Sequence, residues 1–413
     1  MRTLFGPFAQ IITMSNLPLN GPISDKDLEI IYDGGIIVQK ELIIGIGKFS
    51  LLKTQCDEIF EITSPHILLP GFIDCHTHVC FAGSRANEYS KKIEGISYQQ
   101  ILSEGGGIYD TMEKTALSSY DELKKLTENR LNRHFSEGVL TCEVKSGYGK
   151  DFENEIRMLQ IIKDINANNP YDLVSTCLAA HVPPKNEDIS SEMYLSSIIN
   201  DLLPLIKKDK LSNRIDIFIE KGAFNVKEAK AFLKLANEEG FDTLVHGNQF
   251  TNGGLNVAVD SNSISVDHLE VINETEIKYL SKSKTSAVVL PGCSIGIGLP
   301  FAPARKILDH GCCLAIATDW NPGSAPMGDL LTQASILAAN EKLTNAEVFS
   351  AISFRAANAL GLKDRGVIEE NKIADFIGFN ISDYKEILYN QGKIKPSFIC
   401  KRGKVYNNKF LNV

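Results

Sequence analysis

The segment that decides the fold is Leu68-Leu69-Pro70-Gly71-Phe72-Ile73-Asp74-Cys75-His76-Thr77-His78, an apolar strand that ends in two imidazoles one residue apart. In a strand, side chains at positions i and i+2 point to the same side, so both rings can reach one cation. Neutral imidazole nitrogen is a good ligand for zinc or iron(II). The pair therefore indicates a metal centre, although two histidines at a sheet rim can also be simple hydrogen-bonding residues.

Further apolar runs follow this strand along the chain, and segments of helix length separate them. Four of these segments begin with capping-box spacing: Ser119 with Glu122, Asn225 with Glu228, Asn273 with Glu276 and Thr344 with Glu347. The runs are continuously apolar, which is typical of parallel strands that are buried on both faces. Eight such strands favour an α/β fold with a closed (β/α)₈ TIM-like barrel over an open doubly wound sheet. The expected strands are Leu68–Cys75, Gly138–Lys145, Leu173–Ala180, Arg214–Glu220, Asp242–Val245, Ser263–Asp267, Ser286–Leu290 and Cys313–Thr318.

The two ends of the chain have a different pattern. Residues 1–65 and 366–413 lack the alternation of strand and helix, and we expect hairpins at Asp33-Gly34-Gly35 and near Asn407-Asn408. Neither end is long enough to bury a core of its own. We therefore expect both ends to form one small composite β-sandwich domain beside a barrel of residues 66–365.

Composition excludes several classes of protein. The chain has 413 residues, of which 43% are hydrophobic and 23% charged, as in an ordinary globular enzyme. Its net charge of −8 argues against binding to nucleic acid or to an anionic membrane, so we expect neither partner. Nine scattered cysteines without CxxC spacing predict reduced thiols and a cytoplasmic protein.

Polar residues gather where the expected strands end, which is where barrel enzymes carry their catalytic groups. Five of the eight histidines lie at such ends, although His181 or His268 alone could equally be a hydrogen-bonded core residue. We infer that one divalent ion, Zn²⁺ or Fe²⁺, is held by three nitrogens and one carboxylate, with a position left open for water. The ligands that we expect are His76, His78, His246 and Asp319.

Two of these strand-end residues are also candidates for proton transfer. A bound dication lowers the pKa of its water towards about 7. Asp319 can accept a proton from that water and deliver it to a leaving nitrogen, and His268 can hydrogen-bond the water or a developing oxyanion. We therefore expect Asp319 and His268 to be the catalytic residues.

Four motifs resemble the imidazolonepropionase family of the metal-dependent amidohydrolase superfamily: Pro70–His78, Phe81–Tyr89, Glu143–Gly149 and Thr318–Ser324. The resemblance spans nearly the whole chain. It implies hydrolysis of the ring amide C–N bond of 4-imidazolone-5-propanoate to N-formimidoyl-L-glutamate, a step of histidine degradation. It also implies the same four metal ligands, a small anionic substrate and a homodimer.

The resemblance further implies a set of residues that contact the substrate. Arg85 offers a planar fork for the propionate carboxylate, and Tyr148 and His181 offer hydrogen bonds to the ring. The small residues of the last motif permit close approach of the backbone to the substrate. The full set of expected contacts is Arg85, Tyr148, His181, Gln249, Asn321, Gly323 and Ser324.

Three features need separate interpretation. Lys145 lies on the second strand, whereas the carbamylated lysine of two-metal relatives belongs on a later one, so we expect an ion-pairing role and a single metal. Asn248 stands where an acidic residue is expected, two places after His246, and a neutral amide cannot serve as a base. The loop from Phe81 to Ile108 can be a lid over the site or only a connector.

Two other functions stay open. A purine or pyrimidine deaminase would keep the same metal ligands but would not require Arg85 and Tyr148. A catalytically inactive amidohydrolase-like scaffold would be expected to lose metal ligands, and none of the four is missing here.

Overall fold

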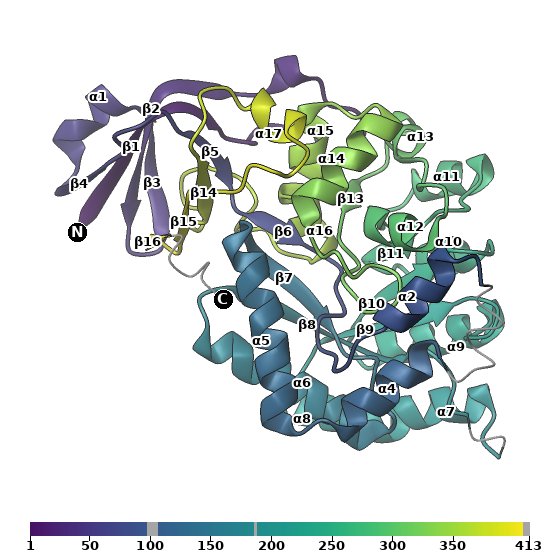
Figure 1. The fold of residues 1–413 in the computed structure, drawn as a ribbon. Coiled ribbons are helices and arrows are strands. Elements are labelled where there is room, and N and C mark those ends of the chain that lie inside the picture. Colours follow the sequence, from purple (N-terminus) through teal and green to yellow (C-terminus); the bar gives the residue numbers. More distant parts are fainter. Residues whose placement is uncertain (97–105, 186–187, 408–413) are drawn as a thin grey trace.

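The computed structural model describes residues 1–96, 106–185 and 188–407. Strands and helices from the middle of the chain alternate around a barrel, and strands from both ends form a second sheet beside it (Figure 1). Part of the predicted Phe81 to Ile108 loop, residues 97–105, and Asn408 of the predicted second hairpin lie outside the described residues.

The barrel sheet contains eight parallel strands in sequence order. They are β6 (Phe72–Asp74), β7 (Val139–Lys145), β8 (Asp172–Ala180), β9 (Arg214–Ile219), β10 (Asp242–Gly247), β11 (Ser265–His268), β12 (Ser286–Val289) and β13 (Leu314–Ile316).

The first and last barrel strands meet just beyond their C-terminal ends. Thr77 and Trp320 form a parallel bridge. The His78 N–H donates to the Trp320 carbonyl over 3.0 Å, and the Asp319 N–H donates to the His76 carbonyl over 3.0 Å. This ring of strands confirms the predicted (β/α)₈ barrel and excludes the open doubly wound sheet.

The predicted first strand, Leu68–Cys75, is in fact two strands that belong to different sheets. β5 (Ile67–Pro70) pairs with the terminal sheet, and β6 starts the barrel. The change occurs at Gly71, whose N–H donates to the Asp375 carbonyl, while the next N–H, of Phe72, donates to the Gly138 carbonyl. The apolar sequence is continuous because both strands are buried, so the pattern alone does not show the division.

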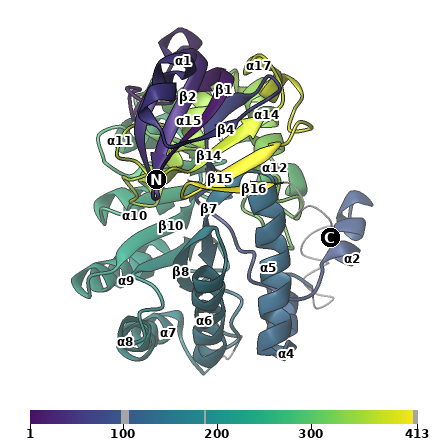
Figure 2. The same cartoon turned by 90° about the vertical axis from the view of Figure 1, so that its left-hand side faces the viewer.

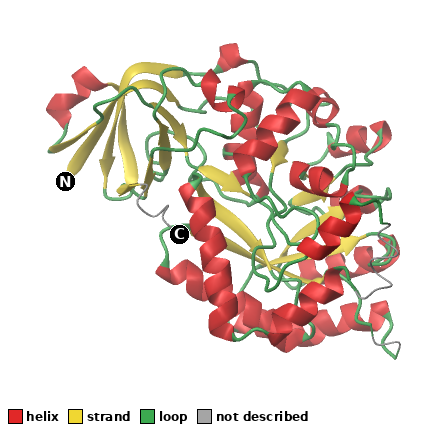
Figure 3. Cartoon of the chain, viewed as in Figure 1, coloured by secondary structure: helices red, strands yellow, loops and turns green. Residues whose placement is uncertain are grey.

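Helices cover the outside of the barrel (Figure 3). The capping boxes predicted for α9, α11 and α15 form in full, whereas Ser119 of α5 makes only the bond from its side chain to the Glu122 N–H. The helices of the barrel region are α2 (Ala86–Ile93), α4 (Ile108–Leu117), α5 (Tyr120–Ser136), α6 (Phe152–Asn168), α7 (Ser191–Ser197), α8 (Leu203–Lys208), α9 (Val226–Glu238), α10 (Gly254–Asp260), α11 (Glu274–Leu280), α12 (Pro291–Ile297), α13 (Ala304–Asp309), α14 (Leu330–Glu341), α15 (Asn345–Ala351) and α16 (Phe354–Ala359).

Strands from both ends of the chain form one mixed sheet, in the order β16-β15-β14-β5-β1-β2-β3, with β4 paired to β1. Figure 2 shows this sheet at one end of the barrel. Its N-terminal Phe5 and Phe8 pack on the C-terminal Phe376 and Phe398, with ring centroids 5.5 and 6.1 Å apart. This shared core confirms that the two ends build one composite unit. The elements outside the barrel are β1 (Arg2–Ile12), β2 (Ile30–Gln39), β3 (Leu42–Lys48), α1 (Phe49–Leu52), β4 (Glu58–Glu61), β14 (Phe376–Phe379), α17 (Lys385–Tyr389), β15 (Phe398–Lys401) and β16 (Lys404–Asn407).

The N-terminal hairpin turn was predicted in the wrong place. Gly34 and Gly35 lie within β2, and the turn between β2 and β3 follows at residues 40–41. The packing around residue 34 requires glycine, because a Cβ there would come within 2.5 Å of the Ile11 side chain. The C-terminal hairpin turns at Arg402 and Gly403, which both adopt positive φ, as a tight two-residue turn requires.

The described helices include none that is long and apolar enough to cross a membrane. All nine cysteine thiols are free, and eight of them are buried.

A cluster of charges ties the barrel to the terminal sheet. Asp172, at the start of β8, accepts from Lys401 Nζ over 2.7 Å and from Arg402 over 3.1 Å, and it also pairs with Arg365. Burial would raise the pKa of Asp172, but these three cations lower it to about 2. The carboxylate is therefore stabilised in its ionised form by folding.

We predict that Asp172→Asn lowers the free energy of unfolding at pH 7 by about 2 kcal/mol, because a carboxyl whose pKa falls on folding stabilises the fold when it is ionised. Since the folded pKa lies below the unfolded one, this contribution is complete above about pH 4 and disappears as the pH falls towards 2. Urea unfolding at pH 7 and at pH 3 measures the difference. The exposed Asp209→Asn is the control, and an equal loss in that variant would contradict the prediction.

Candidate metal centre

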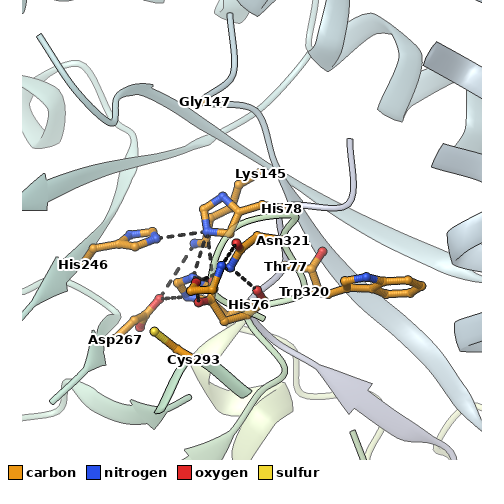
Figure 4. Close-up of polar contacts among 12 residues, drawn as sticks. His76, Thr77, His78, Lys145, Gly147, His246, Asp267, Cys293, Trp320 and Asn321 are labelled. Carbon is orange, nitrogen blue, oxygen red and sulfur yellow. Dashed lines mark hydrogen bonds and ion pairs between the residues drawn. The ribbon is translucent and has the colours of Figure 1, made fainter. Parts of the chain in front are cut away.

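Three histidines converge at the C-terminal ends of the barrel strands (Figure 4), and Asp319 lies against two of them. His76 and His78 follow β6, His246 lies near the end of β10, and Asp319 follows β13. His78 Nε2 lies 3.2 Å from His76 Nε2 and 3.3 Å from His246 Nε2. Asp319 Oδ1 lies 3.5 Å from His76 Nε2 and 3.4 Å from His78 Nε2.

These separations fit a metal ion. Four of the six donor separations are thus 3.2 to 3.5 Å, and a regular tetrahedron with edges of this length would have its centre about 2.1 Å from each corner, which is the length of a bond between zinc and an imidazole nitrogen. His76 Nδ1 lies 2.6 Å from Asp267 Oδ2, and His246 Nδ1 lies 3.0 Å from Asp216 Oδ2, so each Nε2 turns its lone pair to the centre. Burial lowers the pKa of His76 well below its usual value and that of His246 to about 4. Both rings are therefore neutral at pH 7, the form that binds a cation.

The buried charges around the centre also match a dication. Among the described residues, two cations contact the buried carboxylates around the centre. Lys145 Nζ lies 2.8 Å from Glu143 Oε2 and 2.7 Å from Asp216 Oδ2, and Arg214 Nη2 lies 3.7 Å from Glu143 Oε1. Carboxylates therefore outnumber these cations in a region where an unpaired charge is costly, and burial raises the pKa of Asp267 above its usual value. The buried carboxylates at the centre include Glu143, Asp216, Asp267 and Asp319.

Lys145 pairs with the carboxylates of this network. Its ammonium contacts Glu143 and Asp216 and lies 3.8 Å from Asp267. Burial would lower the pKa of Lys145, but these carboxylates raise it above its usual value. A protonated ammonium cannot form a carbamate, so the geometry agrees with the predicted ion-pairing role.

His268 and Asp319 lie next to the histidine cluster. The His268 ring centroid is 5.4 Å from that of His246 and 6.0 Å from that of His76. Burial would lower the pKa of His268, but Glu270, whose carboxylate lies 3.4 Å from Nδ1, raises it well above its usual value. Burial would raise the pKa of Asp319, but the imidazoles of His76 and His78 hold it well below its usual range.

A cavity of about 730 Å³ opens beside the centre. It is large enough for a small organic substrate. Every residue predicted to contact substrate lines it, and so do three of the four expected metal ligands and His268; His76 lies beneath the surface of the cavity. The structure thus brings together the residues Arg85, Tyr148, His181, Gln249, Asn321, Gly323 and Ser324.

Arg85 is held by a neighbouring acid. Its Nε and Nη2 donate to Glu88 Oε2 over 2.9 and 2.7 Å, and its Nη1 faces Gly323. A Cβ at Gly323 would come within 2.2 Å of Nη1, so only glycine leaves room for the guanidinium. Lys92, which the sequence analysis did not select, donates to the Gly323 carbonyl over 3.2 Å.

Tyr148 and His181 share one supporting loop. The buried Glu155 accepts from the Gly147 N–H over 3.0 Å and from the Gly149 N–H over 2.6 Å, which fixes the peptide on both sides of Tyr148. The Gly147 carbonyl in turn accepts from His181 Nδ1 over 3.0 Å. Glu155 on α6 is therefore a positioning residue for both side chains.

Asn248 does not face the centre. Its amide donates to Glu276 over 2.9 Å and accepts from the Leu255 N–H over 2.8 Å, so it joins the starts of α10 and α11. An acid at this position would have no access to the site, and Asn248 removes no base from it. Gln249, the next residue, does line the cavity, and its amide lies 3.1 Å from Cys293 Sγ.

The loop after Asp319 is built by one amide. Asn321 Oδ1 accepts from the Gly323 and Ser324 N–H groups, each over 2.8 Å, and its Nδ2 donates to the Asp319 carbonyl over 2.6 Å. The Ser324 hydroxyl lies 3.3 Å from Asp319 Oδ2. One oxygen of Asp319 thus faces the histidines while the other faces the cavity loop.

The sequence analysis missed the carboxylates behind the histidines. Asp216 alternates with Ile215 and Ile217 in β9, and Asp267 follows Val266 in β11. Charged residues at alternate positions of a buried strand point into the barrel, so this alternation was a signal that could have identified them.

Comparison with known proteins agrees with this geometry. The imidazolonepropionase of Christiangramia forsetii is 36% identical over 355 residues, which cover 85% of this chain and 86% of that protein. The imidazolonepropionase of Bdellovibrio bacteriovorus is 35% identical over 391 residues, which cover 92% and 90%. Residues 222–405 also match the profile described as Amidohydrolase family.

Solved structures share the fold. Atrazine chlorohydrolase from Arthrobacter aurescens, determined in complex with zinc, has a TM-score of 0.71 at 15% identity, covering 100% of this chain and 97% of that one. An adenosine deaminase from Xanthomonas campestris with bound zinc has a TM-score of 0.70 at 16% identity, covering 98% and 92%. Identity this low shows only that the architecture is common to them.

We predict that His246→Ala lowers metal affinity by about 100-fold or more, because it removes one of four converging donors. Elemental analysis after dialysis measures the bound metal. The control is His310→Ala, because His310 lies just after α13 and outside the histidine cluster. Full metal content in the His246 variant would rule out this ligand set.

We predict that Lys145→Met lowers the free energy of unfolding by roughly 3 to 5 kcal/mol, because it leaves buried carboxylates without their shared cation. Thermal and urea unfolding of the metal-free protein measure the loss. The exposed Lys163→Met is the matched control. Unchanged stability in the Lys145 variant would contradict the charge network.

Proposed function

This chain belongs to the imidazolonepropionase family of the amidohydrolases, and we propose that it hydrolyses the ring amide C–N bond of 4-imidazolone-5-propanoate to N-formimidoyl-L-glutamate. The observation that carries the proposal is one cavity that joins a metal donor set to a cationic wall. His78, His246 and Asp319 line one part of it, and Arg85 lines another. A substrate with a cyclic amide and a carboxylate fits this cavity, because its amide can lie at the donor set while its carboxylate lies at Arg85.

The chemistry needs an activated water and two proton transfers. When bound, a divalent ion lowers the pKa of water towards about 7 and so supplies hydroxide at neutral pH. Asp319 takes the proton of the attacking water and delivers it to the ring nitrogen as the C–N bond breaks. Its Oδ2, which lies 3.3 Å from the Ser324 hydroxyl and faces away from the histidines, suits this role.

His268 stabilises the carbonyl oxygen as it gains negative charge. Glu270 favours the protonated form of its ring, which makes His268 a hydrogen-bond donor at neutral pH. Its backbone has φ +88° and that of Asp319 has φ +53°, conformations that cost of order 1–3 kcal/mol each. Such strain fits a pair of side chains held in a reactive arrangement before the substrate binds.

The other cavity residues orient the substrate. Arg85 binds the propionate, and Tyr148 and His181 bind the ring. The ring of His181 stacks on His78, with centroids 5.3 Å apart, and burial lowers the pKa of His181 so that it is neutral. Gln249 and the loop of Asn321, Gly323 and Ser324 complete the contacts.

Several details of the proposal rest on chemistry or on the family. A set of nitrogen and carboxylate donors accepts Zn²⁺ and Fe²⁺, so we expect one of these. The homodimer and the cytoplasmic location that the sequence suggests stay predictions. The barrel is also the fold of an adenosine deaminase, so nucleobases are the comparison substrates of choice.

We predict that the zinc- or iron-loaded enzyme converts 4-imidazolone-5-propanoate and leaves guanine and cytosine unchanged, as chromatography of the products would show. Arg85→Ala should raise KM about 10- to 100-fold with a smaller change in kcat, because it removes a charge-assisted hydrogen bond to the carboxylate. Arg85→Lys, which keeps the charge, should recover part of the loss. Deamination of a nucleobase without turnover of the imidazolone would overturn the proposal.

A further inference from the structure

The cavity has a cationic corner at Gly323, formed by Arg85, Glu88, Lys92 and Gly323 itself. Arg85 precedes α2, Glu88 and Lys92 lie on it, and Gly323 lies in the loop after the metal ligand Asp319. Arg85, Lys92 and Gly323 all line the cavity. Two cations from one short segment therefore meet the loop that carries a metal ligand.

The charge of Arg85 is already compensated. Two of its nitrogens donate to one oxygen of Glu88, and the Glu88 side chain is only 12% exposed. The other Glu88 oxygen accepts from the Gly107 N–H over 3.0 Å, which holds the acid in this position. Arg85 keeps its planar donors, but together with Glu88 it contributes no net charge to the cavity.

Lys92 is differently placed. Its ammonium donates to a neutral carbonyl, that of Gly323, and no carboxylate lies within 4 Å of it among the described residues. An ammonium has three donors, so two stay available after this bond. The side chain is half-buried, and burial together with Arg85 lowers its pKa. Among the described residues, the corner thus has a single excess positive charge, and Lys92 supplies it.

We propose that Lys92 is a specificity-determining residue that, together with Arg85, binds the carboxylate of the substrate and supplies the net charge that selects an acid over a neutral analogue. The inference rests on the proposed function in one respect, that the substrate carries a carboxylate. Arg85 gives the direction of the hydrogen bonds, and Lys92 gives the electrostatic attraction. Because the corner lies four residues after Asp319, the carboxylate is bound at a fixed offset from the metal ligand.

Binding of inert analogues tests this without turnover. The probes are 3-(imidazol-4-yl)propanoate and its primary amide, which differ in charge and are nearly equal in shape. Isothermal titration calorimetry on the metal-loaded wild-type enzyme should show that the acid binds about 30-fold more tightly than the amide. Lys92→Met should lower this preference about 10-fold or more and leave the affinity for the amide unchanged, and Lys92→Arg should retain most of it.

Lys221 is the matched control, since it lines the same cavity but lies after β9 rather than at Gly323. Lys221→Met should reduce the acid preference much less than Lys92→Met. Added salt should weaken acid binding to the wild-type enzyme more than to the Lys92→Met variant.

Three results would overturn the inference. The first is an equal loss for acid and amide in Lys92→Met, which would mean that Lys92 only supports the Gly323 carbonyl. The second is an equal loss of preference in Lys221→Met, and the third is a wild-type enzyme that does not prefer the acid. Failure of the proposed function is a separate result, because it appears as absence of 4-imidazolone-5-propanoate turnover while the analogues still report on Lys92.

Discussion

The molecule depends on the compensation of charge inside the barrel. Asp216 and Asp267 orient His246 and His76 towards the centre, and Lys145 neutralises part of their charge from below. Each of these groups would be costly to bury alone, since an unpaired ion inside a protein destabilises the fold. The folded strands thus assemble a network in which carboxylates outnumber cations. A dication bound at the histidines would compensate this excess, and its binding would then stabilise the barrel.

The sequence predicted the convergence of four polar side chains and the barrel for the same reason. His76, His78, His246 and Asp319 each follow a buried apolar run, and the ends of parallel strands must meet at one rim. Glu155 was not found because its role depends on which face of its helix turns inward, and that follows from tertiary packing. Asp216 did have a sequence signal, its alternation with apolar residues in β9, and this signal was overlooked. Gly34 was mistaken for a turn residue because a glycine needed for close packing has the same sequence appearance as one needed for positive φ.

The site is held in place by bonds that lie outside the cavity. Glu155 fixes the loop of Tyr148, and Asn321 fixes the loop that leads from Asp319 to the Gly323 corner. The main-chain bonds between Asp319 and His76 and between His78 and Trp320 join the first and last barrel strands directly at the metal ligands. Closure of the barrel and assembly of the centre are thus one structural event, which explains how strained conformations at His268 and Asp319 persist.

The division of one apolar run between β5 and β6 has a consequence for how the protein could be shortened or recombined. β5 hydrogen-bonds to β14 from the other end of the chain, and six residues after β5 ends the chain reaches His76. Trimming the C-terminus would leave the backbone of β5 with an open edge, and open edges recruit foreign strands. The barrel therefore depends on both ends of the chain, because the strand that leads to His76 and His78 belongs to a sheet that the two ends build together.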